Sequence, residues 1–129
     1  MQEKIAKLKA VKILFVEDEQ DLITIISDTL TKLQANFITA NNGKEALDVL
    51  SKHDDIDLVV TDINMPIMNG LELIEEVRKT NKGLPFVIMS AHTEPEYIRS
   101  AEALGISDYL LKPFDFIKFI NLVADLNIK

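Results

Sequence analysis

Short apolar runs alternate with amphipathic segments five times along this chain, and that alternation limits its fold more than any other feature. The runs are rich in β-branched and aromatic residues and cover residues 11–16, 37–40, 58–61, 84–89 and 109–111. Each has the length and composition of a buried strand. The segments between them space apolar residues three or four positions apart, as a helix with one buried face requires. The pattern therefore predicts repeated strand–helix units.

The predicted helices carry recognisable start and stop signals. Residues 20–33 place Leu22, Ile26, Leu30 and Leu33 on one helical face. A second helix is expected from a cap at Asn42, with Glu45 three positions on, to about residue 52. The third follows a loop at residues 65–70, turns Leu73, Ile74 and Val77 inward, and ends at Gly83. Thr93 and Glu96 have capping-box spacing for a helix that ends near Gly105. Asp115 begins the last, with Phe116, Ile120 and Val123 on one face.

Strands that are wholly apolar and separated by helices form a parallel sheet covered on both faces. Right-handed crossovers leave few topologies, of which the doubly wound five-stranded sheet is the commonest at this length. We therefore predict an α/β, flavodoxin-like domain with strand order 2-1-3-4-5 and five helices over residues 11–129. Residues 1–10 form a lysine-rich N-terminal extension, either a frayed helix or a disordered lead-in, to which we assign no function.

Composition excludes several classes of protein. The net charge of −7 argues against nucleic acid as a direct ligand, because such binding relies on clustered cations. The chain has no cysteine, which excludes disulfides and thiolate metal sites. No apolar run approaches the roughly 18 residues that span a bilayer, and the N-terminal segment does not resemble an export signal. We expect a cytoplasmic protein that contacts neither membrane nor nucleic acid directly.

Polar residues follow four of the five predicted strands, at the edge of the sheet where ligands bind in such folds. If strands one and three are neighbours, the carboxylates that follow them converge. Three carboxylates within about 5 Å repel by roughly 3 kcal/mol a pair, so either one is protonated or a cation lies among them. The residues are Glu17 and Asp18 after the first strand, Asp62 and Asn64 after the third, Ser90 and Ala91 after the fourth, and Lys112 and Pro113 after the fifth.

The oxygen-only donor set selects a hard ion, Mg²⁺, with Mn²⁺ as the alternative. Asp18 and Asp62 are the expected direct side-chain ligands, and Glu17 is expected to act through water. A backbone carbonyl just past Asp62 can complete the protein's share of ligands.

A carboxylate beside such an ion can act as a nucleophile and form an aspartyl-phosphate. Transfer of a phosphoryl group requires that the charge on its equatorial oxygens be neutralised. Lys112 can meet one of these oxygens, and Ser90 with a backbone N–H can meet another. The predicted site thus contains every group that this chemistry needs.

The chain contains four motifs, ILFVEDE, VVTDINMPIMNG, VIMSAH and YLLKPF. In their order and spacing, these motifs resemble the bacterial response-regulator receiver domain of two-component signalling. The resemblance covers nearly the whole chain, and the combination is far more specific than any single motif. Two variations are mild: Glu stands at the first acidic position, where Asp is commoner, and Ser stands at the hydroxyl position, where Thr is commoner.

The resemblance implies a role for each matching residue. Asp62 is similar to the phosphoacceptor for a kinase phosphohistidine, Glu17 and Asp18 to the acidic pair, and the Asn64 backbone carbonyl to the third protein ligand of Mg²⁺. Ser90 resembles the switch hydroxyl, Lys112 the family's lysine, and Pro113 its proline. Tyr109 is similar to the aromatic that turns inward after phosphorylation, and His92, like Asn64, stands at a position that influences how long the phosphoryl group lasts.

Simpler interpretations remain for some residues. Glu19 and Asp21 are explained by the positive end of the first helix and are left out of the site. Tyr109 is the least specific of the site residues, because an aromatic in a strand is often plain core. Met65 and Met68 indicate loop packing, not a cofactor.

The resemblance implies a signalling switch, not an enzyme, which promotes only its own phosphorylation and dephosphorylation. The expected partners are a histidine kinase or phosphotransfer protein and a downstream protein or fused output domain, with a homodimer as a further arrangement. The contact face would comprise the helix from Thr93, the strand at 109–111 and the helix from Asp115, with Glu96 and Arg99 as candidate contacts. Phosphorylation would change this face by biasing an element that has two arrangements.

Three alternative functions compete with this interpretation. A phosphatase of the haloacid-dehalogenase type uses similar residues but takes its nucleophile from an Asp-x-Asp after the first strand, whereas the nucleophile candidate here, Asp62, follows the third. Such a phosphatase would also need a cap domain to enclose its substrate. A flavodoxin-like FMN carrier would need a hydroxyl- and Gly-rich phosphate loop where this chain has Glu17 to Asp21. A receiver-like scaffold that works without phosphorylation would not need the intact set of site residues.

Overall fold

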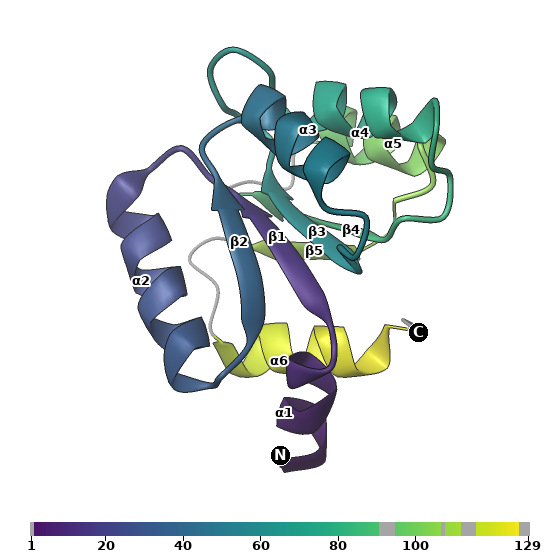
Figure 1. The fold of residues 1–129 in the computed structure, drawn as a ribbon. Helices are drawn as coiled ribbons and strands as arrows, with labels where there is room; N and C mark the ends of the chain where they lie inside the picture. The colour runs from purple at the N-terminus through teal and green to yellow at the C-terminus, as the bar shows by residue number, and fades with distance from the viewer. Residues whose placement is uncertain (1, 91–94, 107, 112–115, 127–129) are drawn as a thin grey trace.

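The structure is a computed structural model that describes residues 2–90, 95–106, 108–111 and 116–126, with the side chains of Ser90, Pro95 and Leu111 outside the description. Among these residues are a five-stranded sheet and six helices (Figure 1). The elements, in chain order, are α1 (Gln2–Lys9), β1 (Lys12–Val16), α2 (Gln20–Lys32), β2 (Asn36–Ala40), α3 (Gly43–Lys52), β3 (Leu58–Asp62), α4 (Gly70–Arg78), β4 (Phe86–Ser90), α5 (Pro95–Ala103), β5 (Asp108–Leu111) and α6 (Phe116–Asp125).

The strands lie parallel in the order β2-β1-β3-β4-β5, which confirms the predicted topology. β1 and β3 are neighbours in register, with Val16 opposite Thr61. The residues that follow Val16 and Thr61 therefore leave the sheet at the same edge. This adjacency of the first and third strands is the feature of the fold that assembles the site.

Two apolar clusters cover the two faces of the sheet, because successive residues of a strand point to opposite sides. Leu14 and Val16 of β1 belong to the cluster beneath α3, α4 and α5. Ile13 and Phe15 belong to the cluster beneath α1, α2 and α6, where the Phe15 and Phe119 rings lie 5.5 Å apart. Figure 1 shows these two helical layers on either side of the sheet.

The predicted inward faces of the helices are confirmed. Ile26 and Leu30 of α2 are buried, with Leu22 and Leu33 half-buried beside them. The inward residues predicted for the third and last helices also lie in the core, Phe116 being half-buried. These are Leu73, Ile74, Val77, Ile120 and Val123.

The helix count of five is wrong, because residues 2–9 form an additional helix, α1. Leu8 is fully buried in the cluster that contains α6. Lys4 Nζ donates to Asn121 Oδ1 at 2.6 Å, and Lys7 Nζ donates to the Ala124 carbonyl at 3.0 Å near the end of α6. A short helix of this kind is stable only because its apolar side is packed. The N-terminal extension thus shares the core of the domain.

One predicted helix end is also wrong. We expected α4 to continue to Gly83, but it ends at Arg78. The Asn81 N–H donates to the Val77 carbonyl, and the Arg78 guanidinium donates to the Asn81 carbonyl. These hydrogen bonds form a local turn in place of a further turn of helix. Gly105 does have the left-handed φ, +84°, expected of a residue that ends a helix.

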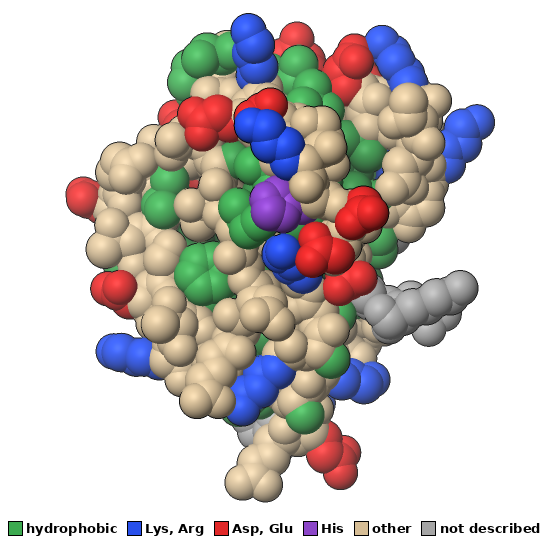
Figure 2. Space-filling view, viewed as in Figure 1, with side chains coloured by type: hydrophobic (Ala, Val, Ile, Leu, Met, Phe, Trp, Pro, Cys, Tyr) green, Lys and Arg blue, Asp and Glu red, His purple; other side chains and the backbone are tan. Residues whose placement is uncertain are grey.

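The surface carries charges of both signs. Figure 2 shows acidic and basic side chains next to one another on one face, around a histidine. Among the described residues, no helix is long and apolar enough to cross a membrane.

Candidate functional site

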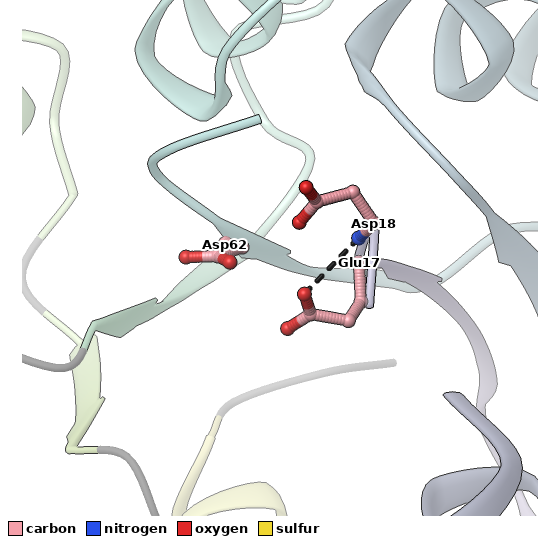
Figure 3. A group of neighbouring side chains, drawn as sticks. All are labelled: Glu17, Asp18 and Asp62. Atoms are coloured by element: carbon pink, nitrogen blue, oxygen red, sulfur yellow. Dashed lines mark hydrogen bonds between the residues drawn. The ribbon is translucent and has the colours of Figure 1, made fainter. Parts of the chain in front are cut away.

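Three carboxylates converge where β1 and β3 end. One oxygen from each of Glu17, Asp18 and Asp62 lies within 4.8 Å of the others. Figure 3 shows Glu17 and Asp18 side by side just beyond β1, with Asp62 next to them at the end of β3. The sequence prediction that these three residues share one edge of the sheet is therefore realised in the structure.

Glu17 is fully buried, and backbone groups hold its carboxylate in place. Its Oε2 accepts hydrogen bonds from the N–H groups of Asp18 at 3.0 Å and Glu19 at 3.2 Å. Those donors open the turn into α2, so the positive end of that helix lies beside the carboxylate. A carboxylate fixed in this way can orient water around an ion.

Asp62 is the last residue of β3 and is only 8% exposed. Its Oδ1 accepts a hydrogen bond from the Ile63 N–H at 2.8 Å, which fixes the orientation of the carboxyl group. The Thr61 hydroxyl donates to the Asp62 carbonyl at 2.9 Å. The side chain is thus oriented by its own strand end and is accessible over only a small part of its surface.

Gly70 also shapes this site, although it was not among the predicted site residues. A Cβ at Gly70 would lie 2.2 Å from the Asp62 carbonyl oxygen, so any larger residue would push α4 away from the end of β3. The Gly70 N–H donates to the Ile63 carbonyl at 2.8 Å, which closes the loop between them. The signal in the sequence was a glycine just after Asn69, where a capping box with Glu72 opens the helix.

The loop between Asp62 and Gly70 contains one strained residue and is hydrogen-bonded to the start of α3. Ile67 has φ of +70° and is 75% exposed, although a β-branched side chain disfavours that backbone region. The Gly43 N–H donates to the Met68 carbonyl at 3.0 Å, which joins the loop to the start of α3. Met65 and Met68 pack against the adjoining core, in agreement with the loop-packing interpretation.

The other predicted residues are only partly described. Asn64 is exposed two residues beyond Asp62. Ser90 ends β4, opposite Leu111 of β5, so its backbone reaches the same edge of the sheet. The remaining predicted site residues, Ala91, His92, Lys112 and Pro113, lie outside the described residues, as do Thr93 and Asp115.

Tyr109 lies on β5 and is half-buried in the cluster beneath α5. Its hydroxyl donates to the carbonyls of Ile98, at 3.3 Å, and Ile106, at 3.2 Å. Burial raises the pKa of Tyr109, and the negative charges of Glu102 and Asp108 add to that shift. In this structure the hydroxyl therefore contacts α5 and the turn that follows it.

A cation fits the carboxylate cluster on the chemistry of its donors. The three side chains offer oxygen ligands only, which suit Mg²⁺ better than a softer metal. Mutual repulsion within 4.8 Å also favours binding of a divalent ion. Asp18 and Asp62 can supply ligands directly, and the Asn64 backbone carbonyl can supply a third.

Comparison with known proteins decides the family. The family model of the response regulator receiver domain matches residues 13–124. The chain belongs to the response-regulator receiver domain family. Receiver domains of this family are signalling modules of two-component systems, and the fold and the acidic cluster described above agree with that membership.

Individual relatives cover most of the chain. It is 37% identical over 106 residues to the chemotaxis protein CheY homolog of Campylobacter jejuni, an alignment covering 80% of this chain and 82% of the relative. The structure of CheY4 of Vibrio cholerae matches with a TM-score of 0.79 and 31% identity, covering 88% of this chain and 98% of that one. CheY in a CheX-CheY-BeF₃-Mg²⁺ complex of Borrelia burgdorferi matches with a TM-score of 0.83 and 26% identity, covering 92% of this chain and 90% of that one.

Proposed function

We propose that this receiver domain accepts a phosphoryl group on Asp62 from a histidine kinase or phosphotransfer protein, with Mg²⁺ bound in the acidic cluster. The observation that carries the proposal is the convergence of three carboxylates within 4.8 Å around the oriented Asp62 side chain. The Borrelia burgdorferi complex, a structural relative with the same fold, contains BeF₃ and Mg²⁺ and gives independent support.

The Asp62 carboxylate is the nucleophile in the proposed reaction. One Oδ oxygen forms a bond to phosphorus as the bond from phosphorus to the donor's imidazole nitrogen breaks, and the imidazole leaves with that electron pair. The Ile63 N–H donates to Oδ1 and so keeps the carboxylate oriented during the reaction. Mg²⁺, when bound, supplies positive charge to the phosphoryl oxygens. Lys112 and the Ser90 hydroxyl are proposed to contact the remaining oxygens, which lowers the charge that develops during transfer.

Beryllofluoride, a phosphoryl mimic, tests this site without a partner kinase. In fluorine NMR, the wild type with Mg²⁺ should show bound beryllofluoride resonances that disappear on chelation of the metal. Asp62→Asn should show none, because the amide lacks the anionic oxygen that coordinates beryllium. Asp21→Asn is the matched control, since Asp21 lies in the first turn of α2 and is not a proposed site residue. Bound resonances of equal intensity in Asp62→Asn would refute the assignment.

We further propose that phosphorylation changes the face formed by α5, β5 and α6. Tyr109 connects β5 with α5 through the Ile98 carbonyl, so movement of its ring would release one of the contacts that hold α5. Glu96 and Arg99 are exposed on α5 and are proposed contacts for a downstream partner, a fused output domain or a second copy of the chain. The proposed setting is the cytoplasm, with no direct contact to nucleic acid or membrane.

Amide hydrogen exchange with and without beryllofluoride tests the proposed face. Protection should change most in α5, β5 and α6. Tyr109 itself lies on β5 and contacts α5 through the Ile98 carbonyl. Changes confined to α2 and α3 would place the signalling face elsewhere and make Tyr109 a core residue only.

A further inference from the structure

A hydrogen bond between two exposed parts of the chain joins α5 to the loop that follows Asp62. The Tyr97 hydroxyl donates to Asn64 Oδ1 at 3.4 Å. Tyr97 is the third residue of α5, and its ring packs against the cluster beneath that helix. Asn64 is exposed and stands two residues after Asp62. The contact therefore runs from an anchored ring to a polar side chain beside the proposed phosphorylation site.

From this contact we infer that Tyr97 is a positioning residue that lengthens the lifetime of the aspartyl-phosphate by holding the Asn64 side chain. The inference rests on the proposed function and extends it to a residue outside the acidic cluster. Tyr97 would not touch the reacting atoms and would act through Asn64 alone.

The chemistry of hydrolysis shows how this contact acts. An attacking water forms a bond from its oxygen to phosphorus while the bond between phosphorus and the Asp62 oxygen breaks. The carboxylate is restored, inorganic phosphate leaves, and the water's proton passes to phosphate or solvent. A carbonyl oxygen that accepts a hydrogen bond from that water orients it for attack.

Asn64 carries such an oxygen, and the Tyr97 hydroxyl competes with water for it. While Oδ1 accepts from Tyr97, the amide is drawn toward α5 and that oxygen is engaged. Release of the amide frees Oδ1 to accept from a water near Asp62. A donor–acceptor distance of 3.4 Å is long for a hydroxyl hydrogen bond, so the interaction is weak and its removal should have a modest effect.

The position of α5 decides whether the contact can form. The end of α5 is held by the Arg78 Nε, which donates to the Leu104 carbonyl at 3.2 Å. Its middle is held by the Tyr109 hydroxyl through the Ile98 carbonyl. Tyr97 lies in the first turn of α5, before both of these attachments in the chain, and its hydroxyl reaches the loop that carries Asn64.

The test is the decay rate of the phosphorylated protein in four variants. The four proteins are the wild type, Tyr97→Phe, Asn64→Ala and the double variant. Each is phosphorylated with a small phosphodonor and Mg²⁺, the donor is removed, and the remaining alkali-labile phosphate is measured over time. Tyr97→Phe removes only the hydroxyl and should speed decay by about threefold, the size expected for one weak hydrogen bond. In the Asn64→Ala background the same change should have no effect, because its target is absent.

A matched control separates the loss of a hydroxyl from the loss of this contact. Ser51→Ala removes a hydroxyl that bonds within α3, to the Asp48 carbonyl, and should leave decay unchanged. The Asn64 side-chain amide resonances in the metal-free protein give a second readout. They should shift in Tyr97→Phe and stay in place in Ser51→Ala.

Three results would overturn the inference. Tyr97→Phe with unchanged or slower decay would show that the hydroxyl does not restrain hydrolysis. Equal acceleration by Tyr97→Phe with and without Asn64 would show that Tyr97 acts by another route. Failure of the wild type to take up label would refute the proposed function itself, and the inference with it.

Discussion

Acidic residues lie at both ends of the parallel sheet. At one end they are bonded to a lysine, and at the other they lie close to one another. At the amino end, Asp55 pairs with the Lys12 ammonium at 3.0 Å, and Asp57 accepts from the Lys12 N–H at 2.9 Å. At the carboxyl end, Glu17, Asp18 and Asp62 approach one another within 4.8 Å. The amino end stabilises the fold, whereas the carboxyl end maintains a repulsion that a cation can relieve.

The difference arises from how each end is connected. Asp57 closes the start of β3 onto β1 with a reciprocal pair, since its own N–H donates to the Lys12 carbonyl at 2.8 Å. At the other end, backbone N–H groups of Asp18, Glu19 and Ile63 hold two of the carboxylates in place without neutralising them. Charges that remain crowded in a folded protein are a common sign of function, because stability alone would not retain them.

The largest expected effect is on metal binding. Asp18→Ala should weaken Mg²⁺ binding by more than about tenfold, because one anionic ligand is lost from an open site. Titration calorimetry or a Mg²⁺-dependent chemical-shift titration would measure it. Asp57→Asn, at the amino end, is the control and should bind Mg²⁺ as the wild type does. Equal weakening by both substitutions would show that the effect is not local to the cluster.

A smaller effect, of opposite sign at the two ends, is expected on metal-free stability. Asp18→Asn should raise the free energy of unfolding by up to about 1 kcal/mol, since a pairwise repulsion of a few kcal/mol is reduced by solvent screening. Asp57→Asn should lower it by about 0.5 kcal/mol, because a charged acceptor becomes neutral. Urea unfolding at low ionic strength with a chelator present measures both. A decrease in both variants would contradict the contrast between the ends.

The smallest effect concerns acid stability. The hydrogen bond from Lys12 lowers the pKa of Asp55 below its ordinary value of 3.8. A carboxylate with a depressed pKa stabilises the folded state above its unfolded pKa, and that contribution is lost as pH falls through the folded pKa. Replacing Asp55 with Asn should therefore slightly flatten the fall in stability below about pH 4. Unfolding curves between pH 5 and about pH 2.5 that overlay after subtraction of a constant would show that the pair has no such role.

Periodicity predicted most of the fold because the apolar pattern follows directly from burial. The strand order followed from chirality and from the alternation of elements, and the inward faces of α2, α4 and α6 followed from spacing. The end of α4 could not be foreseen in the same way, since the turn at Asn81 depends on bonds to Val77 and Arg78 that no local propensity encodes. For α1 the sequence left a frayed helix and a disordered lead-in open, because the helix is stabilised by packing on α6.

The site residues also divide into those that the sequence predicts and those that depend on tertiary packing. Glu17, Asp18 and Asp62 could be grouped from the sequence, because parallel strands bring their carboxyl ends to one edge. Gly70 could not, since its requirement comes from the approach of α4 to the Asp62 carbonyl. Likewise, the Tyr97 contact to Asn64 depends on how α5 lies against the sheet.

The most direct test of the central claim is the site and metal dependence of phosphorylation. With acetyl phosphate and Mg²⁺, intact mass spectrometry should show one added phosphoryl group that is lost in alkali, and peptide mapping should place it on Asp62. A chelator or Asp62→Asn should abolish the addition, whereas Asp57→Asn should leave it intact. An unchanged level of modification in Asp62→Asn would contradict the assignment of Asp62 as the phosphoacceptor.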